Sequence, residues 1–241
     1  MKATSEGLNA RRLEYLLPFQ IREILAARPV AYLPLGTIEW HCEHLPVGLD
    51  ALTAHGLCLR AAASCGGLVY PPLYYGTGGG HGDYPWTVMM PQAREIEGQL
   101  NFTLSRMETL GVKRAVLFSG HFADTQLEMI DRIAAKWNAG KSPLKVAASA
   151  VNRIPGTGFA PDHAGLFETT LLYGLHPDLV QEDRLPPRKS GDSEADPFGE
   201  QRHAPDHPLR GIFGPDPRGF DKTKAQPLVG AIVAHLVELA G

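Results

Sequence analysis

The sequence predicts an α/β fold with three layers, in which a mostly parallel central sheet lies between helices. Short apolar segments of strand length alternate with longer segments of helical apolar spacing, and this alternation is typical of parallel βαβ units. Gly111 and Gly140 each follow a helical segment and predict its end. The chain of 241 residues has the length of one α/β domain with a sizeable core.

The first half of the chain supplies two helices and two strands. Residues 13–27 have helical apolar spacing, which Pro18 interrupts or restarts. Residues 30–35 form an apolar run that predicts a strand ending at Gly36. Residues 51–64, rich in Ala and Leu, predict a helix, and residues 68–75 predict a strand interrupted by prolines.

The second half continues the alternation. We expect a helix at 92–110, a strand at 112–118, a helix at 125–138, a strand at 144–151, and helices at 167–175 and 227–239. No internal repeat is visible, so residues 1–241 are interpreted as a single domain.

A long segment rich in proline and charge, residues 177–224, breaks this pattern. It contains the stretches RLPPRK at 184–189 and GDSEADP at 191–197. Segments of this length inside a compact domain are usually functional or disordered. We expect an excursion that packs over the active site or against a neighbouring subunit.

Composition excludes several classes of partner. The formal net charge is −3 with a sequence pI near 6.4, which gives no indication of nucleic acid or an anionic membrane as partner. No apolar run approaches the roughly 18 residues of a membrane span, and the N-terminus lacks the apolar core of a signal peptide. The three cysteines form no CxxC pair and no disulfide framework. The expected location is therefore the cytoplasm.

The most informative stretch is LPLGTIEWHCEHLPVGLD, residues 33–50. Glu39 and His41 follow a predicted strand and are separated by one residue, so in an extended segment both side chains point to one face. His44 and Asp50 follow at short intervals. Carboxylates and imidazoles at this density are typical of a divalent metal site, and we expect His44 to orient the ligands rather than bind the metal itself.

Two later segments offer further ligands. The strand at 112–118 leads into Ser-Gly-His, which presents His121 at the carboxyl end of a strand, where α/β sheets bind ligands. The segment DHAGLFETT begins at Asp162 and carries His163 and Glu168 at the start of a predicted helix. Each signal alone is weak, because a histidine in a loop or a glutamate at a helix N-terminus has ordinary structural roles. Their combination predicts a metal centre.

The order E-x-H-x-x-H-L-P-x-x-x-D, a Gly-His turn after a strand, and H-A-G-x-x-E-T resembles the creatininase family of metal-dependent amidohydrolases. The resemblance extends from about residue 33 to residue 170 and returns weakly at 211–218 (GIFGPDPR). It implies a creatininase-like three-layer fold, two divalent metal ions per chain (Zn, Mn or Fe), hydrolysis of C–N bonds in cyclic or formyl amides, and a homo-oligomer, with a hexamer as one form.

The resemblance also implies ligands. Glu39, Asp50 and His121 would hold one metal, and His41, Asp50 and a further carboxylate would hold the other. Creatinine-hydrolysing members supply that carboxylate two residues after the Gly-His turn, where this chain has Ala123. We therefore assign it to Glu168, with Asp124 as the alternative, and expect a small-molecule substrate other than creatinine.

Catalytic and substrate-binding roles follow from the same comparison. His163 is the expected proton donor to the departing nitrogen, with Glu168 as the second catalytic residue. His81 and Tyr84 lie in the glycine-rich stretch that replaces a family loop. Together with Trp86 and Trp40 they are expected to contact a flat or cyclic substrate.

Other functions remain open from the sequence. A lactone, sugar-ring or peptide hydrolase would share the same metal site. A mononuclear iron oxygenase needs only two histidines and one carboxylate. A binding protein that has lost its chemistry is consistent with Ala123.

Overall fold

The computed structural model describes residues 5–188 and 201–241. Its central sheet has four parallel strands in the order β2-β1-β5-β6, formed by Leu68–Val69, Val30–Leu35, Arg114–Ser119 and Lys145–Ala150. A second, two-stranded parallel sheet pairs β3 (Gly76–Thr77) with β4 (Met89–Met90). The predicted α/β fold with a mostly parallel sheet is confirmed.

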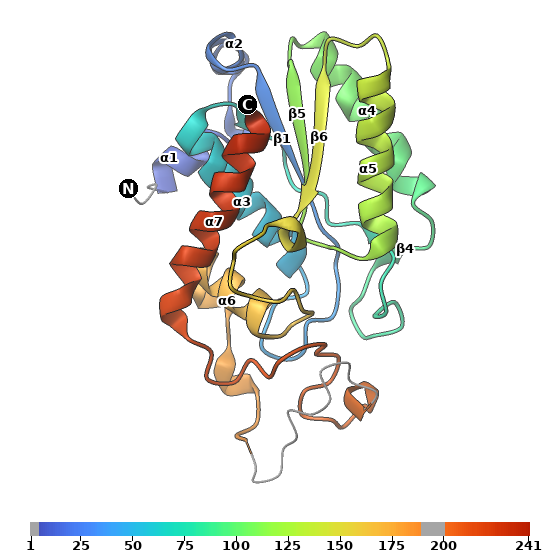
Figure 1. Ribbon diagram of the computed structural model, residues 1–241, viewed down its shortest axis with the longest axis vertical. Coiled ribbons are helices and arrows are strands. Elements are labelled where there is room, and N and C mark those ends of the chain that lie inside the picture. Colours follow the sequence, from blue (N-terminus) through green and yellow to red (C-terminus); the bar gives the residue numbers. More distant parts are fainter. Residues whose placement is uncertain (1–4, 189–200) are drawn as a thin grey trace.

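Helices cover both faces of the central sheet (Figure 1). Tyr32 and Phe118 pack on one face against α3 (Leu49–Cys65), α6 (Leu166–Leu175) and α7 (Ala225–Ala240). Leu33 and Leu117 point to the other face, against α4 (Arg94–Thr109) and α5 (Asp124–Ala139). Adjacent strand residues thus supply two cores, which makes the three layers.

The remaining helices are short or lie outside these two layers. They are α1 (Ser5–Asn9), α2 (Pro18–Ala27), and the 3-10 helices η1 (Leu13–Tyr15), η2 (Val151–Arg153), η3 (Pro177–Leu179), η4 (Glu182–Arg184), η5 (Gln201–His203) and η6 (Lys222–Lys224). Pro18 occupies the first turn of α2, where its missing N–H costs nothing, so it restarts the helix expected at 13–27. None of the helices described is long and apolar enough to cross a membrane.

The strand expected at 68–75 is shorter than predicted. Its ladder with β1 covers Leu68 and Val69, and then continues only as isolated contacts, with Leu73 N–H donating to the Pro34 carbonyl. Pro71 and Pro72 lie between them and have no N–H to donate. The prolines therefore end the strand early.

The strand order places a topological switch point between β1 and β5. The chain runs from β1 to β2 on one side and later returns to β5 on the other. Loops leaving two such strands diverge, and the crevice at their carboxyl ends is where open α/β sheets bind ligands.

Two glycines bring the start of α3 directly onto these strand ends. A Cβ on Gly36, just after β1, would lie 2.2 Å from the Ala51 nitrogen, and a Cβ on Gly120, just after β5, would lie 2.0 Å from the Asp50 carbonyl oxygen. Only glycine permits backbones to approach this closely. The first turn of α3, with Asp50, is therefore held between the two strand ends.

Candidate metal centre

Two groups of three buried side chains meet at the carboxyl ends of β1 and β5. Glu39, Asp50 and His121 form one group, and His41, Asp50 and Glu168 form the other. In each group one potential ligand atom per residue lies within 4.8 Å of the others. Asp50 belongs to both groups, so a single carboxylate connects two candidate metal positions.

The candidate ligands lie at the ends of strands and in the first turns of helices. Glu39 and His41 lie in the loop after β1, Asp50 in the first turn of α3, and His121 just after β5. Glu168 lies in the first turn of α6. The five residues predicted as metal ligands are thus brought together from four parts of the chain.

Backbone hydrogen bonds orient the two histidines. His41 Nδ1–H donates to the carbonyl of Glu39 at 2.9 Å, and His121 Nε2–H donates to the carbonyl of Gly78 at 2.9 Å. These bonds fix the tautomer and leave His41 Nε2 and His121 Nδ1 as lone-pair donors facing the carboxylates. Carbonyl partners of this kind are the usual support for metal-binding histidines.

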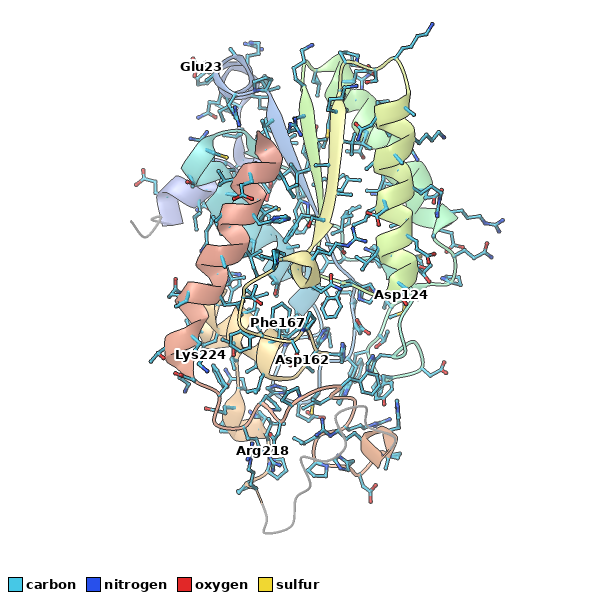
Figure 2. All side chains as sticks on the ribbon, in the orientation of Figure 1. Glu23, Asp124, Asp162, Phe167, Arg218 and Lys224 are labelled. Carbon is cyan, nitrogen blue, oxygen red and sulfur yellow. The ribbon has the colours of Figure 1, made fainter. Side chains whose placement is uncertain are left out.

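Asp162 orients Glu168 through hydrogen bonds to the start of α6, the helix that carries Glu168. The Asp162 carboxylate accepts the backbone N–H groups of Gly165, Phe167 and Glu168 at 3.1, 2.9 and 3.3 Å, and so caps the start of α6. Figure 2 shows Asp162 and Phe167 at this end of the helix. Burial raises the pKa of Asp162 to about 7, and the backbone amides limit that rise.

Residue 164, between His163 and the helix, has a left-handed backbone. Ala164 has a φ of 55°, and its N–H donates to Glu168 Oε2 at 2.6 Å. Cys42, next to His41, also has a positive φ of 58°. Left-handed backbone at non-glycine residues is costly and is concentrated at functional sites. Here it places a backbone donor on a candidate ligand.

The site holds three buried carboxylates close together. Glu39, Asp50 and Glu168 are each 3 % exposed or less. Among the described residues these carboxylates form ion pairs with histidines only, and with no lysine or arginine. Buried carboxylates are stable only when paired with cations or metals.

The histidines respond to this charge. Burial opposes protonation of His41, yet Glu168 and Asp50 raise its pKa to about 10. Burial alone would raise the pKa of Glu39, but the neighbouring His163, His121 and His81 hold that pKa well below the usual range. The cluster thus attracts positive charge, and a divalent cation supplies it more effectively than a proton.

Two buried atoms at the centre of the cluster form no hydrogen bond: His41 Nε2 and Asp50 Oδ2. His41 Nε2 lies 3.3 Å from Asp50 Oδ1 and 3.5 Å from Glu168 Oε2. His121 Nδ1 lies 3.0 Å from Glu39 Oε2 and 3.2 Å from Asp50 Oδ2. A buried nitrogen and a buried oxygen that converge without hydrogen bonds fit a metal, and the residues present therefore suit the ions that the sequence predicts.

Two more histidines stack beside the cluster. The His163 ring lies 3.9 Å from that of His81 and 4.4 Å from that of His41. His163 Nε2–H donates to the carbonyl of Trp40, which leaves Nδ1 as an acceptor. His163 also forms a possible ligand group with Glu39 and His41. Burial and the neighbouring His41 lower the pKa of His163 to about 3.

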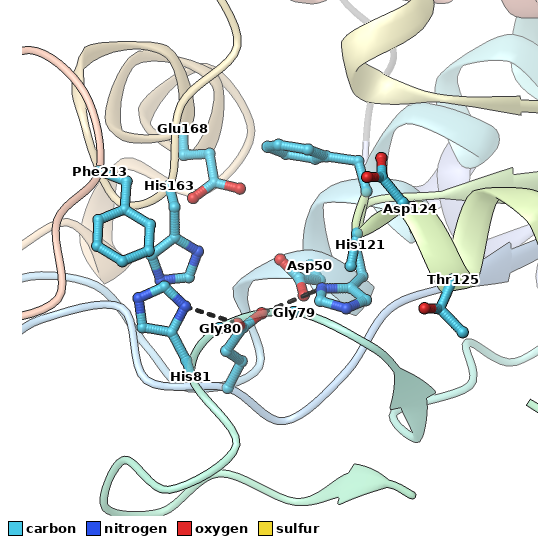
Figure 3. A pocket seen from close by; sticks show the side chains of 13 residues that line it. Asp50, Gly79, Gly80, His81, His121, Asp124, Thr125, His163, Glu168 and Phe213 are labelled. Carbon is cyan, nitrogen blue, oxygen red and sulfur yellow. Dashed lines mark ion pairs between the residues drawn. The ribbon is translucent and has the colours of Figure 1, made fainter. Parts of the chain in front are cut away.

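A cavity of about 430 Å³ opens onto the cluster (Figure 3). Its lining comprises Glu39, Asp50, Gly79, Gly80, His81, His121, Phe122, Ala123, Asp124, Thr125, His163, Glu168 and Phe213. Asp124 lines the cavity without joining a candidate ligand group, whereas Glu168 does both.

The residues predicted to contact substrate separate into two sets. His81 lines the cavity, with Nδ1 3.1 Å from Glu39 Oε1 and Nε2–H donating to the Gly211 carbonyl. Trp40, Tyr84 and Trp86 lie outside the lining. Trp40 is buried and its indole donates to the Arg210 carbonyl, so its role is to hold the 210–213 segment in place. Trp86 is 77 % exposed.

Part of the excursion expected at 177–224 packs over this site. Buried Arg202 donates to the carbonyls of Ile212 and Gly214, and so fixes the turn that carries Phe213. Tyr84 OH and His203 Nδ1 are 2.5 Å apart. Residues 189–200 of the excursion lie outside the described residues. The sequence did not single out Phe213 or Arg202; an aromatic residue between glycines in GIFGPDPR was the available signal.

The sequence profile of the creatininase family, described as "Creatinine amidohydrolase", matches residues 15–240. The chain belongs to the creatininase family. This confirms the resemblance based on the three motifs, and it makes the chain a member of a family of metal-dependent hydrolases.

Two relatives have different activities in their names. A creatinine amidohydrolase of Pseudomonas putida is 30% identical over 183 residues, which cover 67% of this chain and 70% of the relative. A mycofactocin precursor peptide peptidase of Mycolicibacterium smegmatis is 28% identical over 171 residues, covering 68% of this chain and 65% of the relative. The family therefore includes a relative that acts on a peptide.

Solved creatininase structures share the whole fold. A crystal structure of creatinine amidohydrolase has a TM-score of 0.73 and 25% identity, covering 95% of each chain. A structure described as "Creatininase Mn" has a TM-score of 0.72 and 25% identity, covering 95% of this chain and 96% of the other. Others include a mutant of Zn-Zn type and a mutant complexed with creatine. The creatininase-like fold is thus confirmed.

Proposed function

We propose that this protein hydrolyses an amide C–N bond at a dinuclear metal centre. Glu39, Asp50 and His121 hold one divalent ion, and His41, Asp50 and Glu168 hold the other. The observation that carries the proposal is the shared position of Asp50 between two groups whose central atoms, His41 Nε2 and Asp50 Oδ2, have no hydrogen bond. Mixed imidazole and carboxylate donors suit Zn, Mn or Fe, and the Mn and Zn-Zn creatininases support the first two.

Two such ions would supply an activated water and polarise the amide carbonyl. The protein's own contribution begins with His163. Its Nε2–H is held by the Trp40 carbonyl, so Nδ1 is the nitrogen that exchanges protons. Through Nδ1, His163 would pass a proton to the departing nitrogen. Glu168 would hold one ion through its carboxylate, whose Oε2 faces His41 Nε2 and is fixed by the Ala164 amide.

The substrate is a small molecule with a cyclic or formyl amide. Ala123 removes the carboxylate that creatinine-hydrolysing members carry at this place, which argues against creatinine. A peptide is the second candidate, favoured by the peptide peptidase among the relatives. Both are amides and would use the same ions and the same His163. A homo-oligomer, with a hexamer as one form, belongs to this proposal and is tested by the mass in solution.

Metal content per chain tests the centre directly. We expect about two ions in protein purified without chelator or affinity tag, and about one in Glu168→Gln. Glu43→Gln is the matched control, because Glu43 is an exposed carboxylate two residues from His41 and belongs to neither group. At most one ion, unchanged in Glu168→Gln, would contradict the dinuclear centre and favour an oxygenase or a binding protein.

Turnover then separates the substrates. The Zn- or Mn-loaded protein is incubated with cyclic amides, formamides and short peptides, and the released amine is measured. Release from none of the three, with two ions bound, would contradict amide hydrolysis and leave the lactone and sugar-ring readings. Release from peptides alone would favour the second candidate.

A further inference from the structure

We propose that the substrate carries a positively charged group, and that Asp124 is the specificity-determining residue that binds it. This inference rests on the proposed amide hydrolase and narrows its substrate class to amides with an ammonium or amidinium group beyond the scissile bond.

The charges in the cavity limit what it can accept. Three of its four lining carboxylates, those of Glu39, Asp50 and Glu168, belong to the candidate metal groups. No lysine or arginine is among the lining residues in the part of the chain described. An anionic substrate group would therefore meet no cationic side chain away from the metals, whereas a cationic group would meet Asp124.

Asp124 lines the cavity as an exposed carboxylate at the first residue of α5. Its carboxylate forms no hydrogen bond or ion pair with any other described residue. It begins α5, at the end of that helix nearest the site (Figure 2). A carboxylate at a helix N-terminus stabilises the helix. At that position the charge also faces the cavity, where a cationic group of the substrate would meet it.

The position of Asp124 sets the shape of the substrate. Figure 3 shows Asp124 and Thr125 on the side of His121, across the cavity from His163 and Phe213. The reacting amide lies at the ligands between these two sides, so the charged group must be separated from it by a spacer. Phe122, Ala123 and Phe213 make the adjacent lining apolar, which favours a flat or hydrocarbon spacer.

Three formanilides with the same ring test the inference. Their para substituents are aminomethyl (cationic), hydroxymethyl (neutral) and carboxylate (anionic). Dissociation constants are measured by ligand-observed NMR on the Zn-loaded protein, and hydrolysis is measured as formate released. We expect the dissociation constant of the cationic probe to be about fivefold lower than that of the neutral one, as for a partly exposed ion pair. The anionic probe should have the highest dissociation constant of the three.

Variants assign the preference to one residue. Asp124→Asn should reduce the ratio of the two dissociation constants, neutral to cationic, from about five to near one. Glu128→Gln removes the same charge from an exposed position one turn along α5, outside the cavity lining, and should keep the ratio of wild type. Thermal denaturation of both variants establishes that α5 remains folded.

The outcomes of the two proposals are distinct. Equal binding of the three probes, no binding of the cationic probe, or an unchanged ratio in Asp124→Asn overturns the role of Asp124. Formate released at equal rates from the neutral and cationic probes would leave the hydrolase standing while that role fails. Charge-ordered binding without formate from any probe would instead count against formamide hydrolysis and keep the preference for a cation.

Discussion

Replacing Asp162 with alanine should destabilise the protein through the start of α6. The Asp162 carboxylate accepts three backbone N–H groups, those of Gly165, Phe167 and Glu168. The first N–H groups of a helix have no partner within the helix, and this end is buried. Asp162→Ala therefore leaves buried donors without an acceptor.

The size of the loss follows from two opposing contributions. Each buried donor left unsatisfied costs about 1–3 kcal/mol. Burial of Asp162 is itself unfavourable, as its raised pKa of about 7 indicates, and the variant no longer bears that cost. The net loss in free energy of unfolding should be about 2–4 kcal/mol. The variant should also retain less metal, because the candidate ligand Glu168 lies in the first turn of α6.

Urea unfolding of the metal-free proteins, followed by tryptophan fluorescence, measures this loss. Asp221→Ala is the matched control: Asp221 caps η6 by accepting from Thr223 N–H and Thr223 OH, but it lies in solvent. Asp221→Ala should therefore lose clearly less free energy of unfolding than Asp162→Ala. A loss below about 1 kcal/mol for Asp162→Ala, with an unchanged dependence on urea, would refute the reasoning.

Three further outcomes are expected in the same unfolding assay. Gly120→Ala should lower the free energy of unfolding by more than about 3 kcal/mol, since its Cβ would meet the Asp50 carbonyl oxygen at 2.0 Å; a loss below about 1 kcal/mol would contradict this. Gly98→Ala, in open space within α4, should stabilise by about 0.5–1 kcal/mol, and destabilisation would contradict it. Burial and Arg12 lower the pKa of His55 to about 4 from 6.5, so the unfolded chain alone binds this proton between those pH values and stability falls as the pH drops. His55→Gln should reduce that fall by up to about 2–3 kcal/mol at pH 4, and an identical pH profile would contradict the assignment.

The sequence was most informative where ligands are close in the chain. Glu39, His41 and Asp50 lie within twelve residues, directly after an apolar run of strand length that ends at Gly36. Because strand ends in a parallel sheet share one edge, His121 after the next core strand was expected near them. The structure brings all of these residues together with Glu168.

Contacts made at long range were beyond such reasoning. Trp40 was predicted to contact the substrate because of its neighbours in sequence. Its indole instead donates a hydrogen bond to Arg210, 170 positions away, and the 210–213 segment covers it. Phe213 reaches the cavity only because buried Arg202 fixes its turn. The local signal at Phe213, an aromatic residue between glycines, is weak, since an aromatic residue in such a segment is equally compatible with solvent.

Asp50 differs from the other candidate ligands in how it is positioned. Glu39 and His41 depend on the loop after β1, and Glu168 depends on Asp162 and Ala164. The backbone at Asp50 is instead in direct contact with the strand-end glycines Gly36 and Gly120, which belong to the two strands of the switch point. Its carboxylate is thus positioned by the sheet itself, and a shift of either strand end displaces a ligand that both groups share. Loss of Glu168 perturbs one candidate position, whereas movement of α3 on the sheet would perturb both together.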